Sequence, residues 1–358
     1  MPSLKEIKGR INSISSTLAI TSAMKMVASA KLQKAQMAIQ NMLPYERRLY
    51  SMLLDLIGAM NISAAASEDG SVRGSGSAER GFDQSGDRLS LSNRHDLAGM
   101  DGAYSLMAQR EVRKVAIVAF ASNSSLCGAF NSNVIREATA VINEYRASGL
   151  RDSDIVVYSV GRKMAEAMRK LGFPSPADFT KMSDSPSYEA ASALAQELLD
   201  GFVSGRFDKV ELVYNHYKST SSQPTTRQTY LPLSLADATA DLQAGKIADS
   251  ASESDTNRGA EPVGAPVVRQ GSPTTEDLIV EPSKEALIAT LLPKVVRLRI
   301  FTTLLDSAAA EHAARTVAMQ LATDNGNDLL QELTLEYNKG RQQKITSEIL
   351  DLVGGSMQ

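Results

Sequence analysis

The fold is decided at the amino terminus, where residues 4–32 read LKEIKGRINSISSTLAITSAMKMVASAKL. Apolar and small residues recur there at alternating spacings of three and four, which is the heptad spacing of a helix that packs lengthwise against another helix. The members of this seam are Leu4, Ile7, Ile11, Ile14, Leu18, Thr21, Lys25, Ala28, Leu32, Ala35, Ile39 and Met42. We therefore predict a first helix from Ser3 to about Gly58. At 1.5 Å per residue, about 55 residues span on the order of 80 Å, so the helix must protrude from a compact domain.

Pro44 interrupts this pattern. Proline lacks a backbone donor and crowds the preceding turn, so it should either kink the helix or end it and start another.

The carboxyl-terminal part of the chain repeats the heptad spacing. Its seam consists of Leu291, Val295, Leu298, Thr302, Leu305, Ala309, His312, Thr316, Met319, Thr323, Gly326, Leu330, Leu333 and Tyr337. Many of these residues are small or hydroxylic, which allows two backbones to approach closely but buries less apolar area per turn. We predict a long antiparallel coiled coil of the two terminal helices that depends on partners for part of its stability.

An alternation of strand and helix patterns lies between the two long helices. We predict strands at 114–120, 155–160, 209–217 and 226–233, and helices at 131–147, 162–171 and 188–203. Such an alternation is typical of parallel β-α-β units in one sheet. The predicted fold class is therefore a central Rossmann-like α/β domain with a long antiparallel α-helical coiled coil formed by the N- and C-terminal helices.

Two segments, about 63–106 and 237–276, are rich in Ser, Gly and charged residues and poor in large apolar ones. We interpret them as loops or disordered insertions, with a functional lid as the alternative. The predicted division is 1–60 for the first helix, 61–110 for an insertion, 111–236 for the α/β domain, 237–278 for a second insertion, and 279–358 for the last helix.

The composition narrows the class of protein. Apolar residues make up 43% of the chain, which is enough for a core, and the net charge of -3 argues against a general nucleic-acid binder. With Cys127 as the single cysteine, no intramolecular disulfide can form, which suits a reducing compartment. The start of the chain has no leader-like apolar segment, and no stretch reaches the length of a membrane helix. We expect neither secretion nor membrane spanning.

A search for catalytic chemistry finds little. Phosphate-binding loops, dinucleotide-binding glycine patterns and nucleophile elbows are missing, and His95, His216 and His312 are not at metal-ligand spacing. For His216 we expect a partly buried, hydrogen-bonded side chain. The segment from Ser122 to Asn131 follows a strand, at the edge where α/β sheets bind ligands. Cys127 in this segment is a possible nucleophile, but a buried thiol fits better because no base follows it. We predict no catalytic residue, cofactor, metal or small-molecule substrate.

Three motifs, in order along the chain, are similar to one family. They are residues 23–32 (AMKMVASAKL), residues 126–131 (LCGAFN), and residues 335–349 (LEYNKGRQQKITSEI) followed by Gly354 and Gly355. In these motifs the chain resembles the gamma subunits of F-type ATP synthases. It departs from their pattern at Asn123, Ser124 and Ser125, where the family has an acidic residue, a basic residue and a glycine, and it lacks the cysteine pair of plant-type gamma subunits.

The resemblance implies a non-catalytic rotor of the central stalk, which couples proton-driven c-ring rotation to ATP synthesis. The implied partners are the alpha and beta subunits of the catalytic hexamer, the epsilon subunit and the membrane c-ring. The implied partner-binding residues are Met24, Lys25, Arg341, Gln342, Thr346 and Glu348. The implied location is peripheral, on the cytoplasmic face of the bacterial inner membrane.

Two other functions remain open. A coiled-coil scaffold or adaptor without a rotor role would be soluble and folded alone. An α/β enzyme would need a ligand pocket with perturbed titratable groups at the edge from Ser122 to Asn131.

Overall fold

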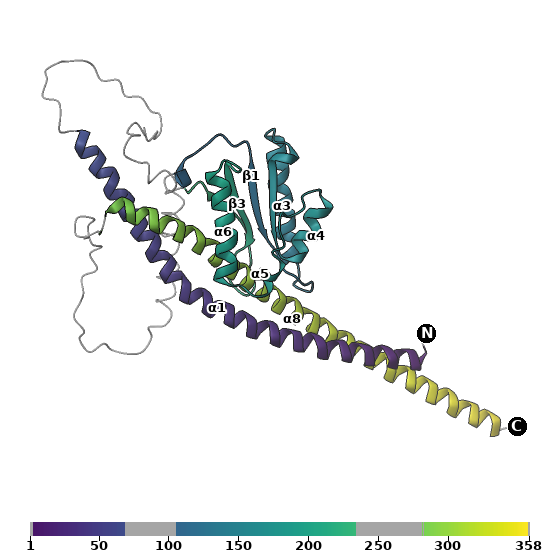
Figure 1. The fold of residues 1–358 in the computed structure, drawn as a ribbon. Helices are drawn as coiled ribbons and strands as arrows, with labels where there is room; N and C mark the ends of the chain where they lie inside the picture. The colour runs from purple at the N-terminus through teal and green to yellow at the C-terminus, as the bar shows by residue number, and fades with distance from the viewer. Residues whose placement is uncertain (1–2, 69–104, 234–280, 282, 357–358) are drawn as a thin grey trace, which may run out of the picture.

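The structure, a computed structural model, describes residues 3–68, 105–233, 281 and 283–356 of the chain. Two long helices, α1 (Leu4–Glu68) and α8 (Lys284–Ser356), lie side by side, and an α/β domain packs against one part of the pair (Figure 1). Both termini lie at the same end, where α8 extends further than α1 (Figure 1). The predicted architecture is confirmed.

Contacts between the two helices establish their antiparallel direction. Thr302 Oγ1 donates a hydrogen bond to Glu46 at 3.2 Å, and Thr323 Oγ1 donates one to Thr21 at 3.1 Å. As the residue number rises along α1, the partner's number falls along α8. All the predicted seam positions of α1 and α8 are buried or half-buried, so the heptad spacing identified the contact face correctly.

The first helix is longer than predicted. It continues through Pro44 to Glu68, so of the two outcomes expected at this proline, ending the helix is wrong. The interpretation of residues 63–68 as a loop is also wrong. Three consecutive alanines at 64–66 have the highest helix propensity, and extending an existing helix carries no nucleation cost.

The predicted insertions fall largely outside the described residues. At the end of the first one, Ser105–Met107 forms a short 3-10 helix, η1, and Leu106 is buried in the domain core. The loop interpretation is therefore wrong at this point as well. The segment 69–104 and the whole of 237–276 are not described.

The α/β domain contains a four-stranded sheet in the order β2-β1-β3-β4. Its strands are β1 (Val115–Phe120), β2 (Ile155–Val160), β3 (Lys209–Asn215) and β4 (Thr225–Leu231). β1 pairs in parallel with β2 and β3, as predicted, whereas β4 runs antiparallel to β3. The remaining elements are α3 (Phe130–Ala147), η2 (Asp152–Asp154), α4 (Arg162–Lys170), α5 (Thr180–Asp184) and α6 (Tyr188–Val203). The five-residue α5 was not predicted.

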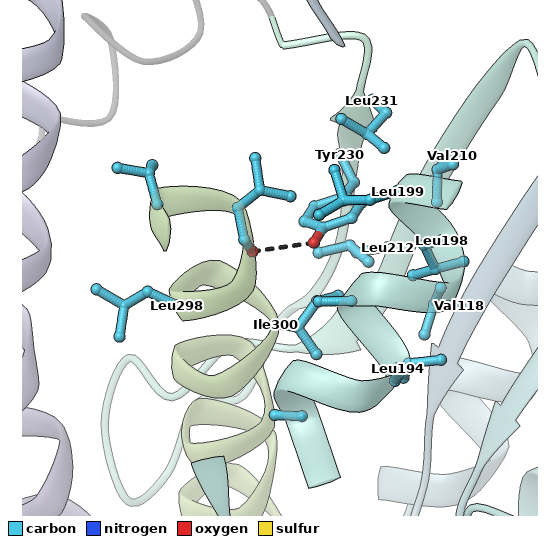
Figure 2. Close-up of a cluster of buried hydrophobic side chains, with 14 of the residues drawn as sticks. Val118, Leu194, Leu198, Leu199, Val210, Leu212, Tyr230, Leu231, Leu298 and Ile300 are labelled. Carbon is cyan, nitrogen blue, oxygen red and sulfur yellow. Dashed lines mark hydrogen bonds between the residues drawn. The ribbon is translucent and has the colours of Figure 1, made fainter. Parts of the chain in front are cut away.

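The two faces of the sheet are covered by different helices. Alternate β1 residues Val115, Ile117 and Ala119 pack in a core with α3 and α4. Their neighbours Ala116, Val118 and Phe120 pack in a larger core with α6, α1 and α8. Figure 2 shows part of this larger core, in which Ile300 of α8 lies on the side of the α6 leucines and Leu298 points to the opposite side of α8. The shaft helices are therefore part of the domain core.

A buried hydrogen bond fixes α8 against the sheet. Tyr230 of β4 is 1% exposed, and its hydroxyl donates to the backbone oxygen of Val296 at 2.9 Å (Figure 2). A buried hydroxyl without a hydrogen-bond partner would be destabilising. Positions of α8 that break this bond are therefore disfavoured.

Candidate partner-binding site

Met24 and Lys25 lie on the two-stranded part of the shaft, and both side chains are half-buried. Lys25 belongs to the heptad seam, and Met24 lies beside it, so both are partly covered by α8. The next two residues point outward instead, with Met26 66% exposed and Val27 59% exposed. In this motif the exposed large apolar side chains are therefore Met26 and Val27, and Met24 and Lys25 are less accessible to a partner.

The other four predicted residues lie near the end of α8, and all are exposed. Thr346 Oγ1 donates to the backbone oxygen of Gln342 at 2.9 Å, which leaves the amide of Gln342 unused by that bond. Glu348 lies 3.9 Å from Lys344, and both side chains are more than 60% exposed. A solvated pair of this kind contributes little to stability, so both charges are available to a partner.

The two groups of residues do not form one site. Gly340 of α8 lies beside Leu4, the first residue of α1, so Arg341 and the residues after it form a single helix beyond the end of its partner. Thr21 pairs with Thr323, and the 18 residue steps from Thr323 to Arg341 measure on the order of 27 Å along the helix. The structure thus shows two separate contact bands, one on the paired shaft and one on its single-helix tip.

The tip also carries apolar residues that the sequence analysis missed. Exposed large side chains there are Ile345, Ile349, Leu350, Leu352 and Val353. The signal was present in the sequence, because apolar residues outside the heptad seam follow the point where α1 has no more residues to pair with. An exposed apolar stripe on a protruding helix is typical of a surface covered by another protein.

Part of the sheet edge from Ser122 to Asn131 contacts α8. Arg315 of α8 donates a hydrogen bond to Ser124 Oγ at 2.6 Å. Gly128 has a φ of 57°, and a Cβ built on it would lie 3.7 Å from the Cβ of Ala318 in α8. Cys127 is 1% exposed and packs with Phe130 and Ala310. The thiol that could have served as a nucleophile is thus buried against α8, which disfavours the enzyme alternative, although Ser124, Ser125 and Leu126 remain exposed.

Two histidines lie where the shaft meets the domain. The pKa of His216 is raised above 6.5 because its ring hydrogen-bonds Asp306. The predicted hydrogen bond is therefore confirmed, but the predicted partial burial is wrong, because half of the His216 side chain is exposed beyond the end of β3. Burial, together with Arg315 and Lys31, lowers the pKa of His312 to about 4. In the described part of the chain, no group of three His, Cys, Asp or Glu side chains is arranged to hold a metal ion. His95 lies outside the described residues.

The geometry therefore defines a shaft protein, in which a helical pair built into an α/β domain ends in a protruding tip with apolar and polar residues exposed. In the described residues, no helix is both long and apolar enough to cross a bilayer.

Comparison with known proteins gives the family. The family described as "ATP synthase" matches residues 3–357. The chain is 47% identical to the ATP synthase gamma chain of Phocaeicola vulgatus and 45% identical to that of Bacteroides thetaiotaomicron, with 100% of each chain covered in both cases. A solved rotor of the Euglena gracilis mitochondrial ATP synthase covers 96% of this chain and 98% of its own, at 18% identity and a TM-score of 0.49. The chain belongs to the ATP synthase gamma chain family.

Proposed function

We propose that this chain turns inside the catalytic hexamer of an ATP synthase and couples proton-driven rotation of a membrane c-ring to ATP synthesis. The observation that carries the proposal is family membership over the full length, at 47% identity to a gamma chain. The shape supports it, because a helical pair that continues the core of an α/β domain can transmit a turn of that domain to its tip.

The two contact bands fit the needs of a rotor. A shaft that meets each beta subunit in turn must bind none of them so tightly that it stops. Exposed single hydrogen bonds and solvated ion pairs are worth little each, and this keeps the alternative positions close in free energy. Met24 and Lys25 are proposed to face the beta subunits, and Arg341, Gln342, Thr346 and Glu348 to contact the alpha and beta subunits around the tip.

The α/β domain is proposed to contact the epsilon subunit and the c-ring, since the opposite end of the molecule is taken up by the tip. The complex is proposed to lie on the cytoplasmic face of a bacterial inner membrane, with this chain as a peripheral subunit. Nucleotide chemistry takes place in the hexamer, so this chain needs no cofactor and binds no small-molecule substrate.

Isolation from native membranes tests the proposal. The chain, tagged on its α/β domain, is purified in mild detergent, and the isolate is assayed for subunit content and ATP hydrolysis. We expect an ATP-hydrolysing alpha–beta hexamer with one copy of this chain, together with epsilon and c subunits. A folded homo-oligomer without ATPase activity would contradict the proposal and favour the scaffold alternative.

A further inference from the structure

The segment directly after β3 contacts both long helices. Gln36 Nε2 of α1 donates to the hydroxyl of Tyr217 at 2.6 Å. The backbone N–H of Tyr217 donates to Asp306 Oδ1 of α8 at 2.9 Å, and His216 Nδ1 lies 2.6 Å from Asp306 Oδ2. We call these four residues, Gln36, His216, Tyr217 and Asp306, the clasp. One carboxylate thus takes both a backbone and a side-chain contact from the α/β domain.

The clasp lies where the shaft leaves the domain. Leu304 is the last α8 residue in the large core, and Asp306 follows it two positions later. From here on, α8 meets the domain mainly through small residues, and the ring of Tyr217 packs between two small clusters. These clusters contain Leu32, Ala35, Ile39, Ala309 and Ala313 on one side, and Cys127, Phe130, Ala310 and Ala314 on the other.

Small apolar surfaces hold two elements together but do not fix their relative rotation. Apolar burial is non-directional, and alanine contacts change little in energy when one helix turns against another. A hydrogen bond weakens steeply when its angle changes, and a bond to an ionised group is roughly twice as strong as a neutral one. The directional contacts at the exit point therefore resist a twist of the shaft, together with the hydrogen bonds of Tyr230 and Arg315 described above.

We propose that Asp306 is a positioning residue that fixes the rotational setting of the shaft relative to the α/β domain, through its contacts with His216 and Tyr217. The inference rests on the proposed rotor function, because only a rotor has to carry a twist across this joint. Asp306 touches no reacting group and acts through the angle at which the shaft is held.

The charge of His216 adds a pH dependence. Its hydrogen bond to Asp306 raises its pKa above 6.5, while Lys218 acts in the opposite direction. Glu46 and Arg47 of α1 and Arg299 of α8 line, together with His216 and Asp306, a cavity of about 390 Å³. A raised histidine pKa means that the ion pair is fully present below about pH 6.5 and is lost as pH rises through the folded-state pKa of His216.

The test uses the assembled complex with the hexamer immobilised and a probe on the α/β domain, without nucleotide. The angular spread of the probe is recorded for wild type, Asp306→Ala, Asp306→Asn and His216→Gln, from about pH 6 to about pH 9 around the histidine pKa. Asp324→Asn is the matched control, because Asp324 is exposed on the same helix and hydrogen-bonds Gln320 within it. Asn at 306 retains an acceptor for the Tyr217 N–H, so this variant is expected to fold if the alanine variant does not.

We expect the widest spread for Asp306→Ala, an intermediate one for Asp306→Asn, and a wild-type spread for Asp324→Asn. The wild-type spread should grow as pH rises, whereas Asp306→Asn and His216→Gln should be flat with pH. Hydrogen exchange at the Tyr217 amide should be about tenfold faster in Asp306→Ala, as for loss of a charge-assisted hydrogen bond. An angular spread in Asp306→Ala equal to that of wild type would overturn the proposal. If the alanine variant does not assemble, the same result in Asp306→Asn would overturn it. A wild-type angular spread that does not change with pH would also overturn it. Failure of the wild-type chain to assemble would instead refute the proposed rotor function.

Discussion

Gly326 of α8 lies directly against Leu18 of α1: a Cβ built on Gly326 would be 2.6 Å from Leu18 Cδ2. The two backbones approach closely here because one of them has no side chain. Replacing Gly326 with Leu would force the helices apart at the middle of the shaft. Overpacking costs about 1–3 kcal/mol, and the gain of about 1 kcal/mol from removing a helical glycine offsets only part of it. We expect a lower unfolding midpoint of the full chain, measured by circular dichroism.

Gly9 is the matched control for this substitution. It also lies inside α1, but a Cβ built there has no neighbour within 4 Å. Gly9→Leu should stabilise the chain by about 0.5–1 kcal/mol through helix propensity and a less flexible unfolded state. Equal effects at the two glycines would show that close helix approach does not determine the stability of the shaft.

Glu211 forms a buried charge cluster on β3. Its carboxylate accepts from Arg227 Nε at 2.7 Å and from the Tyr145 hydroxyl at 2.7 Å, and it lies 2.6 Å from Lys209 Nζ. Glu211→Gln should destabilise the full chain by about 3 kcal/mol, because Lys209 and Arg227, whose side chains are only 26% and 27% exposed, lose the carboxylate between them. Urea unfolding at neutral pH measures this loss.

Glu144, which also pairs with Arg227, is the control because 63% of its side chain is exposed. Glu144→Gln should cost less than about 1 kcal/mol. A loss at Glu144 as large as that at Glu211 would rule out burial as the source of the effect.

Acid should weaken the same cluster. Burial by itself would raise the pKa of Glu211, but hydrogen bonds from Arg227, Lys209 and Tyr145 outweigh it and hold the pKa below 4.5. A depressed carboxyl pKa contributes stability above the unfolded value that is lost as pH falls through the folded value. The free energy of unfolding should therefore fall below about pH 4.5, and Glu211→Gln should reduce that slope. An unchanged slope in the variant would contradict the assignment.

The pKa values of the two described histidines should be shifted in opposite directions. Nδ1 of His312 is buried without a hydrogen-bond partner among the described residues, and the pKa of His312 is lowered to about 4. Its contribution to stability is present above about pH 6.5 and is lost as pH falls towards 4, whereas that of His216 is lost as pH rises. NMR titration of the histidine ring protons, assigned with His216→Gln and His312→Gln, measures both. A shared pKa near 6.5 would refute the environments described here.

The tip residues should affect coupling more than folding. Arg341 and Gln342 are exposed on the single-helix part of α8, so Arg341→Ala with Gln342→Ala should change the stability of the chain by less than about 0.5 kcal/mol. ATP synthesis by the reconstituted complex should fall. Asn338→Ala, one turn earlier and also exposed, is the control. Unchanged ATP synthesis in the double variant would contradict the proposed site.

Periodicity was enough to predict the shaft, because a seam such as Leu18, Thr21 and Lys25 records which side of a helix is covered. The strands were predicted for a similar reason, since β1 is buried along its whole length. The continuation of α1 through Pro44 depends on packing against α8 and could not be deduced from propensity. The separation of the two contact bands depends on how α1 is aligned along α8. The heptad seam of one helix alone does not specify this alignment. His216 and Asp306 of the clasp are 90 positions apart, so no local sequence pattern could predict their contact.

Rotation itself is the most direct test of the rotor proposal. The hexamer is fixed to a surface, a probe is attached to the α/β domain of this chain, and ATP is added. The account predicts continuous turning of the probe in one direction, which stops when ATP is removed. A probe that stays fixed while the complex hydrolyses ATP would contradict it.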